Sequence, residues 1–189
     1  MKNIAIFASG QGTNAKNIIH YFKGHDQLAI ALIVSNNPKA GVLEVAAQAG
    51  IPSIILDKKE YYGSGEALRR SLDHHDIDGI VLAGFLWLIP AYLLEKYGHA
   101  VINIHPALLP KYGGKGMYGM HVHQTVWANR EPISGITIHE VNPRYDEGNI
   151  IFQATCKVST LDTPDDIAQK IHQLEYIHYP KVIEKYFLS

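Results

Sequence analysis

A chain of 189 residues, of which 47% are hydrophobic and 19% charged, is long enough for one domain with a sizeable core and too short for two. The formal net charge of −1, with acidic and basic residues interspersed, indicates neither a nucleic-acid partner nor a membrane surface, so we expect small-molecule partners. Lys2 and Asn3 lead straight into a strand-like run, and no apolar stretch is long enough to cross a bilayer, which favours a cytoplasmic location.

Apolar runs and helical patterns alternate along the first hundred residues. Continuous runs rich in Val, Ile and Ala predict strands covered on both faces, at 3–8, 28–35, 53–56, 79–83 and 100–104. Helical patterns lie between them, at 14–22, 42–49, 66–74 and 90–97, the last with Pro90 at a plausible first position. Such alternation predicts a parallel sheet with right-handed crossovers.

The pattern changes beyond Pro110. A glycine-rich segment precedes a short helix at 121–128, two consecutive strands at 133–141 and 149–158, and a helix from about 164 to 186. Cys156, the only cysteine, excludes an internal disulfide bond and is typical of a packed residue. We expect an α/β fold in one domain, 1–189: an open, mostly parallel twisted sheet with helices on both faces. About 1–100 would form a Rossmann-like phosphate-binding half, and about 101–189 would carry the catalytic site.

The first candidate binding motif is ASGQGTN, residues 8–14, between the first strand and the first helix. Its two glycines let the backbone bend sharply and approach a ligand, and the unpaired amides of a helix N-terminus favour a phosphate. The motif lacks the Lys-Ser/Thr ending of a Walker loop and the full dinucleotide fingerprint. A tight turn with Thr13 as N-cap is the structural alternative.

The fourth strand ends in a glycine and an apolar, aromatic segment, LAGFLWLIP at residues 82–90. Ligands of open parallel sheets bind outside the carboxyl ends of strands, so this segment can offer an apolar wall to a flat heterocycle. A hydrophobic plug over the sheet is the alternative interpretation, and Trp87 fits either one.

Three polar side chains stand where two apolar runs end. Asn103 and His105 are two apart on the fifth strand and therefore share a face, and Asp146 follows the strand at 133–141. An amide and a protonated imidazole can donate to a carbonyl oxygen that becomes negative. A carboxylate can orient the imidazole, favour its cationic form and position a water for proton transfer. We expect an active site here. The alternative is that Asn103 and His105 form a hydrogen-bonded structural pair and that Asp146 belongs to a turn.

The chain has eleven histidines, and their spacing predicts no metal site. His121 and His123 are two apart on a helix and do not share a face, and no zinc motif is present. His139, in the strand before Asp146, is more typical of a packed, hydrogen-bonded residue. His172 and Glu175 share a face of the last helix, where a salt bridge competes with contact to a ligand amine or ribose.

The segments SGQGTN, LAGF, NIHPALLPKYGG, SGITIHEV, DEGNIIFQ and LEYIHYP follow one another in this order. Over nearly its whole length the chain resembles the phosphoribosylglycinamide formyltransferase family. The resemblance implies the formyltransferase fold and transfer of a formyl group from 10-formyltetrahydrofolate, a co-substrate, to the primary amine of glycinamide ribonucleotide in purine biosynthesis. It implies no metal, and we expect a monomer or weak homodimer.

The resemblance also implies roles for single residues. Asn103, His105 and Asp146 match the catalytic trio of the family. The residues implied to hold the ribonucleotide are Gly12, Thr13, Asn14, His172 and Glu175. The residues implied to line the folate pocket are Leu86, Trp87, Leu88, Ile89, Asn103, Asn142, Pro143, Arg144, Tyr145 and Asp146.

Direct transfer is the mechanism that we expect. The amine attacks the formyl carbon, Asn103 and protonated His105 stabilise the oxyanion, and Asp146 arranges proton transfer, so no covalent enzyme intermediate is required. Alternatives within the same fold are a formyltetrahydrofolate hydrolase, which normally has an extra amino-terminal domain, and a transfer-RNA or sugar-nucleotide formyltransferase. A non-catalytic phosphosugar- or folate-binding module is the alternative from another class.

Overall fold

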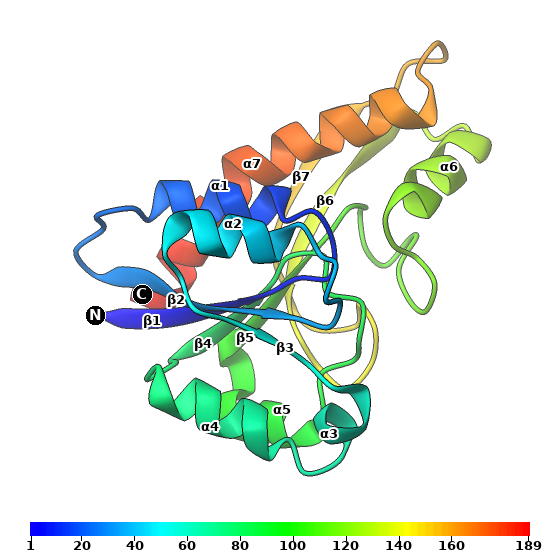
Figure 1. Ribbon diagram of the computed structural model, residues 1–189. Coiled ribbons are helices and arrows are strands. Elements are labelled where there is room, and N and C mark those ends of the chain that lie inside the picture. Colours follow the sequence, from blue (N-terminus) through cyan, green and yellow to red (C-terminus); the bar gives the residue numbers. More distant parts are fainter.

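In the computed structural model of residues 1–189, strands and helices alternate from residue 2 to residue 105, as the apolar runs predict, except that two helices follow one another after β3 (Figure 1). This part consists of β1 (Lys2–Phe7), α1 (Thr13–Tyr21), β2 (Leu28–Ser35), α2 (Val42–Ala49), β3 (Ser53–Ile55), α3 (Lys58–Tyr62), α4 (Glu66–His74), β4 (Gly79–Leu82), α5 (Ala91–Tyr97), the short 3-10 helix η1 (Gly98–Ala100) and β5 (Val101–His105). The remainder consists of α6 (Met120–Ala128), β6 (Ile133–Glu140), β7 (Ile150–Lys157) and α7 (Pro164–Leu188). None of the helices combines the length and apolarity that crossing a membrane requires.

All strands join one seven-stranded sheet in the order β3-β2-β1-β4-β5-β6-β7. Strands β1 to β5 are parallel, whereas β6 is antiparallel to β5 and β7 is antiparallel to β6. The expectation of an open, mostly parallel sheet is confirmed. Because the carboxyl ends of β1, β4 and β5 meet at one edge, the loops that follow these three strands lie together there.

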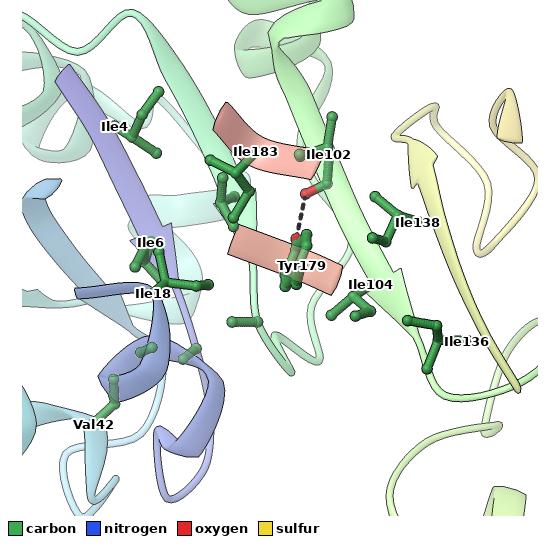
Figure 2. Close-up of a cluster of buried hydrophobic side chains, with 14 of the residues drawn as sticks. Ile4, Ile6, Ile18, Val42, Ile102, Ile104, Ile136, Ile138, Tyr179 and Ile183 are labelled. Carbon is green, nitrogen blue, oxygen red and sulfur yellow. Dashed lines mark hydrogen bonds between the residues drawn. The ribbon is translucent and has the colours of Figure 1, made fainter. Parts of the chain in front are cut away.

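Helices cover both faces of this sheet. α1, α2 and α7 pack on one face, and α3, α4 and α5 pack on the other (Figure 1). Tyr179, on the buried side of α7, lies among isoleucines of the sheet (Figure 2). Its hydroxyl donates to the Leu82 carbonyl at 2.8 Å and lies 3.5 Å from that of Ile102, so the buried phenol is satisfied within an apolar cluster.

Three local details differ from the sequence-based expectations. Helix α3 was not expected, because a five-residue helix is too short to show an apolar period; its signal is Asp57, whose carboxylate accepts from the Glu60 amide at 2.9 Å. Pro90 is the N-cap of α5 and not its first residue. Gly12, not Thr13, is the N-cap of α1: its φ is 79°, and a Cβ there would lie 2.7 Å from Val42 Cα.

Candidate active site

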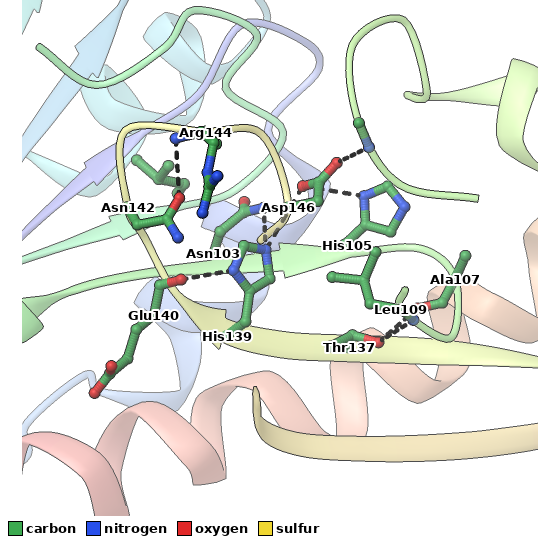
Figure 3. A network of polar contacts seen from close by, with 12 residues as sticks. Asn103, His105, Ala107, Leu109, Thr137, His139, Glu140, Asn142, Arg144 and Asp146 are labelled. Atoms are coloured by element: carbon green, nitrogen blue, oxygen red, sulfur yellow. Dashed lines mark hydrogen bonds and ion pairs between the residues drawn. The ribbon is translucent and has the colours of Figure 1, made fainter. Parts of the chain in front are cut away.

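Asn103 and His105 lie at the end of β5, and Asp146 lies in the loop between β6 and β7 (Figure 3). Nδ1 of His105 is 3.5 Å from Oδ1 of Asp146. The same oxygen is 3.6 Å from Nε2 of His139, and that nitrogen is 3.1 Å from the amide nitrogen of Asn103. The structure therefore brings the three expected side chains into one cluster, in which His139 connects Asn103 to Asp146.

His139, which the sequence favoured as a packed, hydrogen-bonded residue, is buried and hydrogen-bonded as a member of this cluster. It is 2% exposed and faces Asn103 across the antiparallel pair of β5 and β6. Its Nδ1 donates to the Glu140 carbonyl at 2.7 Å, since a carbonyl can only accept. With the proton on Nδ1, Nε2 can accept from one N–H of Asn103, which orients the amide and leaves the second N–H for another partner.

The environment of His105 favours its neutral form. The ring is 3% exposed, and its Nε2 donates to the Tyr112 carbonyl at 2.7 Å. Burial lowers the pKa of this imidazole and outweighs Asp146, whose charge acts to raise it. Asp146 thus acts toward the cationic form, as expected, against the larger effect of burial, and the cationic His105 of the expected mechanism stays a prediction. The proton sits on Nε2, and Nδ1 faces Asp146 as an acceptor.

Asp146 is held in its ionised form. Burial opposes the charge, but His139, His105 and the Gly114 amide together keep the pKa of this carboxyl below its ordinary value; the two histidines contribute when they carry a proton on the nitrogen that faces Asp146. The Gly114 N–H donates to Oδ2 at 2.9 Å. The carboxylate therefore has one oxygen fixed by backbone and the other directed at the two histidines.

A second polar cluster lies where α7 packs on α1. Glu175, 5% exposed, accepts from the Asn14 amide and from Nδ1 of His172, both at 2.9 Å. The hydrogen bond to Glu175 raises the pKa of His172. The charge of Glu175 also acts on His105, so the two clusters are neighbours. The expected helix ion pair is present, and it is joined to the loop after β1.

Two buried polar atoms near the second cluster have no hydrogen-bond partner in the protein: Oδ1 of Asn14 and Nδ1 of His123. The His123 ring, on α6, is centred 6.5 Å from that of His172. Buried polar atoms are nearly always paired, so these two mark a place suited to a polar ligand. Gly12 and Thr13 precede Asn14 at the N-terminus of α1, where backbone amides favour an anion.

The apolar segment after β4 is partly exposed at the same edge. Trp87 packs against Tyr61 and Tyr62, with ring centroids 5.4 and 5.8 Å apart. Leu86 is 42% exposed, and Ile89 is 5% exposed within the core beneath α5. Leu88 contributes its carbonyl, which accepts from the Tyr61 hydroxyl at 3.1 Å. Leu86 and Trp87 are thus available to a ligand, whereas the side chain of Ile89 packs inside.

The loop after β6 faces this aromatic cluster. Tyr145 is close enough to Tyr61 and Tyr62 to raise their pKa values, after burial as the main cause. Asn142 Oδ1 accepts from the Arg144 amide at 2.9 Å, and the Arg144 guanidinium pairs with Glu147 at 2.8 Å. Pro143 is exposed. The two segments expected to line one pocket therefore lie near each other, with apolar rings on both.

Comparison with known proteins fixes the family. The family model described as "Formyl transferase" matches residues 2–183. The chain belongs to the formyl transferase family. A formyl transferase relative from Bacillus subtilis (strain 168), phosphoribosylglycinamide formyltransferase, is 37% identical over 189 aligned positions, and the alignment covers 98% of this chain and 94% of the relative. The chloroplastic phosphoribosylglycinamide formyltransferase of Arabidopsis thaliana is 36% identical over 187 residues. This chain spans 64% of the length of that relative and 60% of the one from Vigna unguiculata.

Solved structures of formyl transferases have the same fold. Phosphoribosylglycinamide formyltransferase from Bacillus halodurans superposes with a TM-score of 0.87 at 34% identity, covering 97% of this chain and 94% of that one. The enzyme of the same name from Streptococcus pneumoniae TIGR4 also gives 0.87 at 34% identity, with 99% of both chains covered. The expected formyltransferase fold is confirmed.

Proposed function

We propose that this formyl transferase moves the formyl group of 10-formyltetrahydrofolate to the primary amine of glycinamide ribonucleotide, a step of purine biosynthesis. The observation that carries the proposal is the meeting of Asn103, His105 and Asp146 at the edge of the sheet, beside the cluster around Glu175. The name and nearly equal length of the Bacillus subtilis relative support it.

The ribonucleotide suits the edge between α1 and α7. The backbone amides at Gly12, Thr13 and Asn14 open a helix and are suited to its phosphate. Oδ1 of Asn14 lacks a donor, and Glu175 with His172 offers acceptors and a donor to the ribose or the amine. A substrate hydroxyl or ammonium that pairs with a buried unpaired acceptor removes a cost of roughly 1–3 kcal/mol.

The folate suits the border formed by the loops after β4 and β6. Bound there, it supplies an activated formyl carbon. Leu86, Trp87 and Tyr145 offer partly exposed apolar surface to flat rings, and Asn142 and Arg144 offer polar groups on the facing loop. A mostly apolar wall with few polar groups is the ordinary lining of a site for such a molecule.

Asn103 is the donor to the formyl oxygen in this proposal. His139 holds one N–H of its amide, so the second N–H has a fixed direction before substrate arrives. A preorganised donor stabilises the negative charge that develops on the oxygen, and it loses little energy in reorganisation.

His105 and Asp146 handle the protons. Nδ1 of the neutral imidazole is an acceptor that faces an ionised carboxylate, so a proton placed there is stabilised by Asp146. Negative charge on the formyl oxygen strengthens this protonation, because an opposite charge nearby favours the imidazolium. Asp146 also orients a water that carries the proton from the attacking amine to the leaving nitrogen.

One assay separates the candidate activities. The purified chain is mixed with 10-formyltetrahydrofolate, with and without glycinamide ribonucleotide, and release of tetrahydrofolate is followed. We expect release only when the ribonucleotide is present. Release without it would indicate a hydrolase, and no release in either mixture would indicate a binding module; both outcomes contradict the proposal.

Single replacements test the assigned residues. We expect Asn103→Ala and Asp146→Asn each to lower kcat by about 10²-fold or more, as loss of an oxyanion donor or a tuned proton carrier does elsewhere. Asn129→Ala is the matched control, since its amide contacts only the Thr125 carbonyl at the exposed end of α6. Near-normal turnover in both active-site variants would rule out these roles.

A further inference from the structure

One short backbone segment contacts two of the residues proposed for catalysis. The Tyr112 carbonyl accepts from Nε2 of His105 at 2.7 Å. Two residues later, the Gly114 N–H donates to Oδ2 of Asp146 at 2.9 Å. The segment 112–114 therefore fixes the imidazole and the carboxylate relative to each other, and it decides which ring nitrogen of His105 carries the proton.

Tyr112 adopts a backbone conformation that its own side chain disfavours. Its φ is 58°, in the left-handed region, where Cβ crowds the following carbonyl oxygen. Such a conformation persists where surrounding contacts hold it. The carbonyl that meets His105 belongs to this residue, so relaxation of Tyr112 would move the acceptor away from Nε2.

Glu131 supplies contacts that hold Tyr112. Its Oε1 accepts from the Tyr112 hydroxyl at 2.8 Å and from Nζ of Lys111 at 2.9 Å. Glu131 lies between α6 and β6, so the phenol is tied to a part of the fold outside the segment 112–114. The hydrogen bonds from Lys111 and Tyr112 hold the pKa of Glu131 below its ordinary value, and a charged acceptor strengthens both bonds.

We propose that Glu131 is a positioning residue: by holding the Tyr112 hydroxyl, it keeps the Tyr112 carbonyl on Nε2 of His105 and the Gly114 amide on Asp146. Its role in turnover rests on the proposed formyl transfer; its effect on the His105 ring does not. With Glu131 in place, Nδ1 of His105 remains the proton acceptor that faces Asp146. Without it, the ring exchanges tautomers or turns, and fewer molecules present that acceptor.

The test compares Glu131→Ala, Tyr112→Phe and Glu131→Gln with the unmodified chain. Nitrogen NMR of the imidazole rings reports which nitrogen of His105 is protonated, with the signals assigned by their loss in His105→Asn. Turnover assays give kcat and KM for both substrates. Glu66→Gln is the control, because this exposed carboxylate pairs only with Arg70 on α4.

Glu131→Ala and Tyr112→Phe are expected to lower the fraction of His105 protonated at Nε2. Their kcat should fall about fivefold or more, because the loss of one net hydrogen bond changes a rate by about that factor, and KM should stay nearly unchanged. Glu131→Gln retains an oxygen that accepts from the phenol and should keep the ring signals and most of kcat. Ring signals in Glu131→Ala and Tyr112→Phe identical to those of the unmodified chain would overturn the inference, whatever happens to Tm. If the unmodified chain transfers no formyl group, the proposed function fails, and the ring signals still decide the role of Glu131 in holding His105.

Discussion

A single buried histidine makes the stability of this protein sensitive to acid. His123 is 3% exposed, and its Nδ1 has no partner in the protein. Burial, followed by the nearby His172, lowers its pKa from 6.5 to about 4. Between these two pKa values the unfolded chain binds a proton that the folded chain does not. The free energy of unfolding therefore falls as the pH falls through this window.

Replacing His123 by leucine should remove part of this loss. We expect His123→Leu to lose less stability than the unmodified chain between about pH 6.5 and pH 4, where one proton costs up to about 1.4 kcal/mol per pH unit. His105, whose pKa is also lowered by burial, keeps part of the slope, and His172, whose pKa is raised by Glu175, acts in the opposite direction. Urea unfolding across this range measures the difference; equal losses in both proteins would contradict the assignment.

Strand β6 supports the site through close contacts with both neighbours. A Cβ at Gly135 would lie 2.1 Å from the Ala154 carbonyl oxygen of β7, so only glycine allows the two strands to pair there. Two residues later, Thr137 Oγ1 accepts from the Leu109 amide at 3.0 Å and fixes the turn after β5 (Figure 3). Two residues further, His139 orients Asn103. Gly135, Thr137 and His139, at alternate positions of β6, thus link the outermost strand β7 and the turn after β5 to the catalytic cluster.

Gly135→Ala should loosen this element. The added methyl group must displace backbone, so we expect a loss of about 1–3 kcal/mol in the free energy of unfolding and a lower kcat. Gly10→Ala is the stability control, because a Cβ at that position meets nothing within 4 Å and its φ needs no glycine. Urea unfolding measures both variants, and equal stability of the two would show that the pairing of β6 and β7 tolerates a side chain.

The whole molecule assembles its binding edge from distant parts of the chain. Asn14 and Glu175 form a hydrogen bond although they are 161 positions apart. Trp87, after β4, packs against Tyr61 and Tyr62, and Tyr145, after β6, is near enough to act on the pKa values of both tyrosines. The expected division into a phosphate-binding half, about 1–100, and a catalytic and folate-binding half, about 101–189, stays a prediction. The cluster of Asn103, His105 and Asp146 lies within the second part, whereas the cluster around Glu175 draws on both.

Thermal unfolding with one ligand at a time tests this arrangement. Glycinamide ribonucleotide alone and tetrahydrofolate alone, each at about 100 times its Kd, should raise the Tm by roughly 5–10 °C. We expect Asn14→Ala to lose most of the shift with the ribonucleotide and keep that with the folate. Trp87→Ala should show the reverse. Loss of both shifts in either variant, with an unchanged Tm of the protein alone, would mean that the two ligands do not occupy separate ends of the edge.

The sequence was sufficient to predict features that depend on neighbours along the chain. Apolar runs and helical periods placed the strands, the crossovers and most helices, and they put Asn103 and His105 on one face of β5. They could not predict α3, because a five-residue helix is too short to show a period. They also placed Pro90 at the first position of α5, whereas it is the N-cap of that helix. The convergence of Asp146 with these residues was predicted only on the assumption that its strand lay next to β5.

The sequence by itself determined the fold class and the chemical groups available at the strand ends, because spacing and side-chain type are local properties. Only the tertiary structure decided which ring nitrogen of His105 donates to the Tyr112 carbonyl, the partnership of His139 with Asn103 and the contacts of Glu131 with Tyr112. Each of these depends on which surfaces exclude water and which distant segments meet. Desolvation of an imidazole and the register of two strands are set by the assembled sheet and its loops, and no period along the chain encodes them.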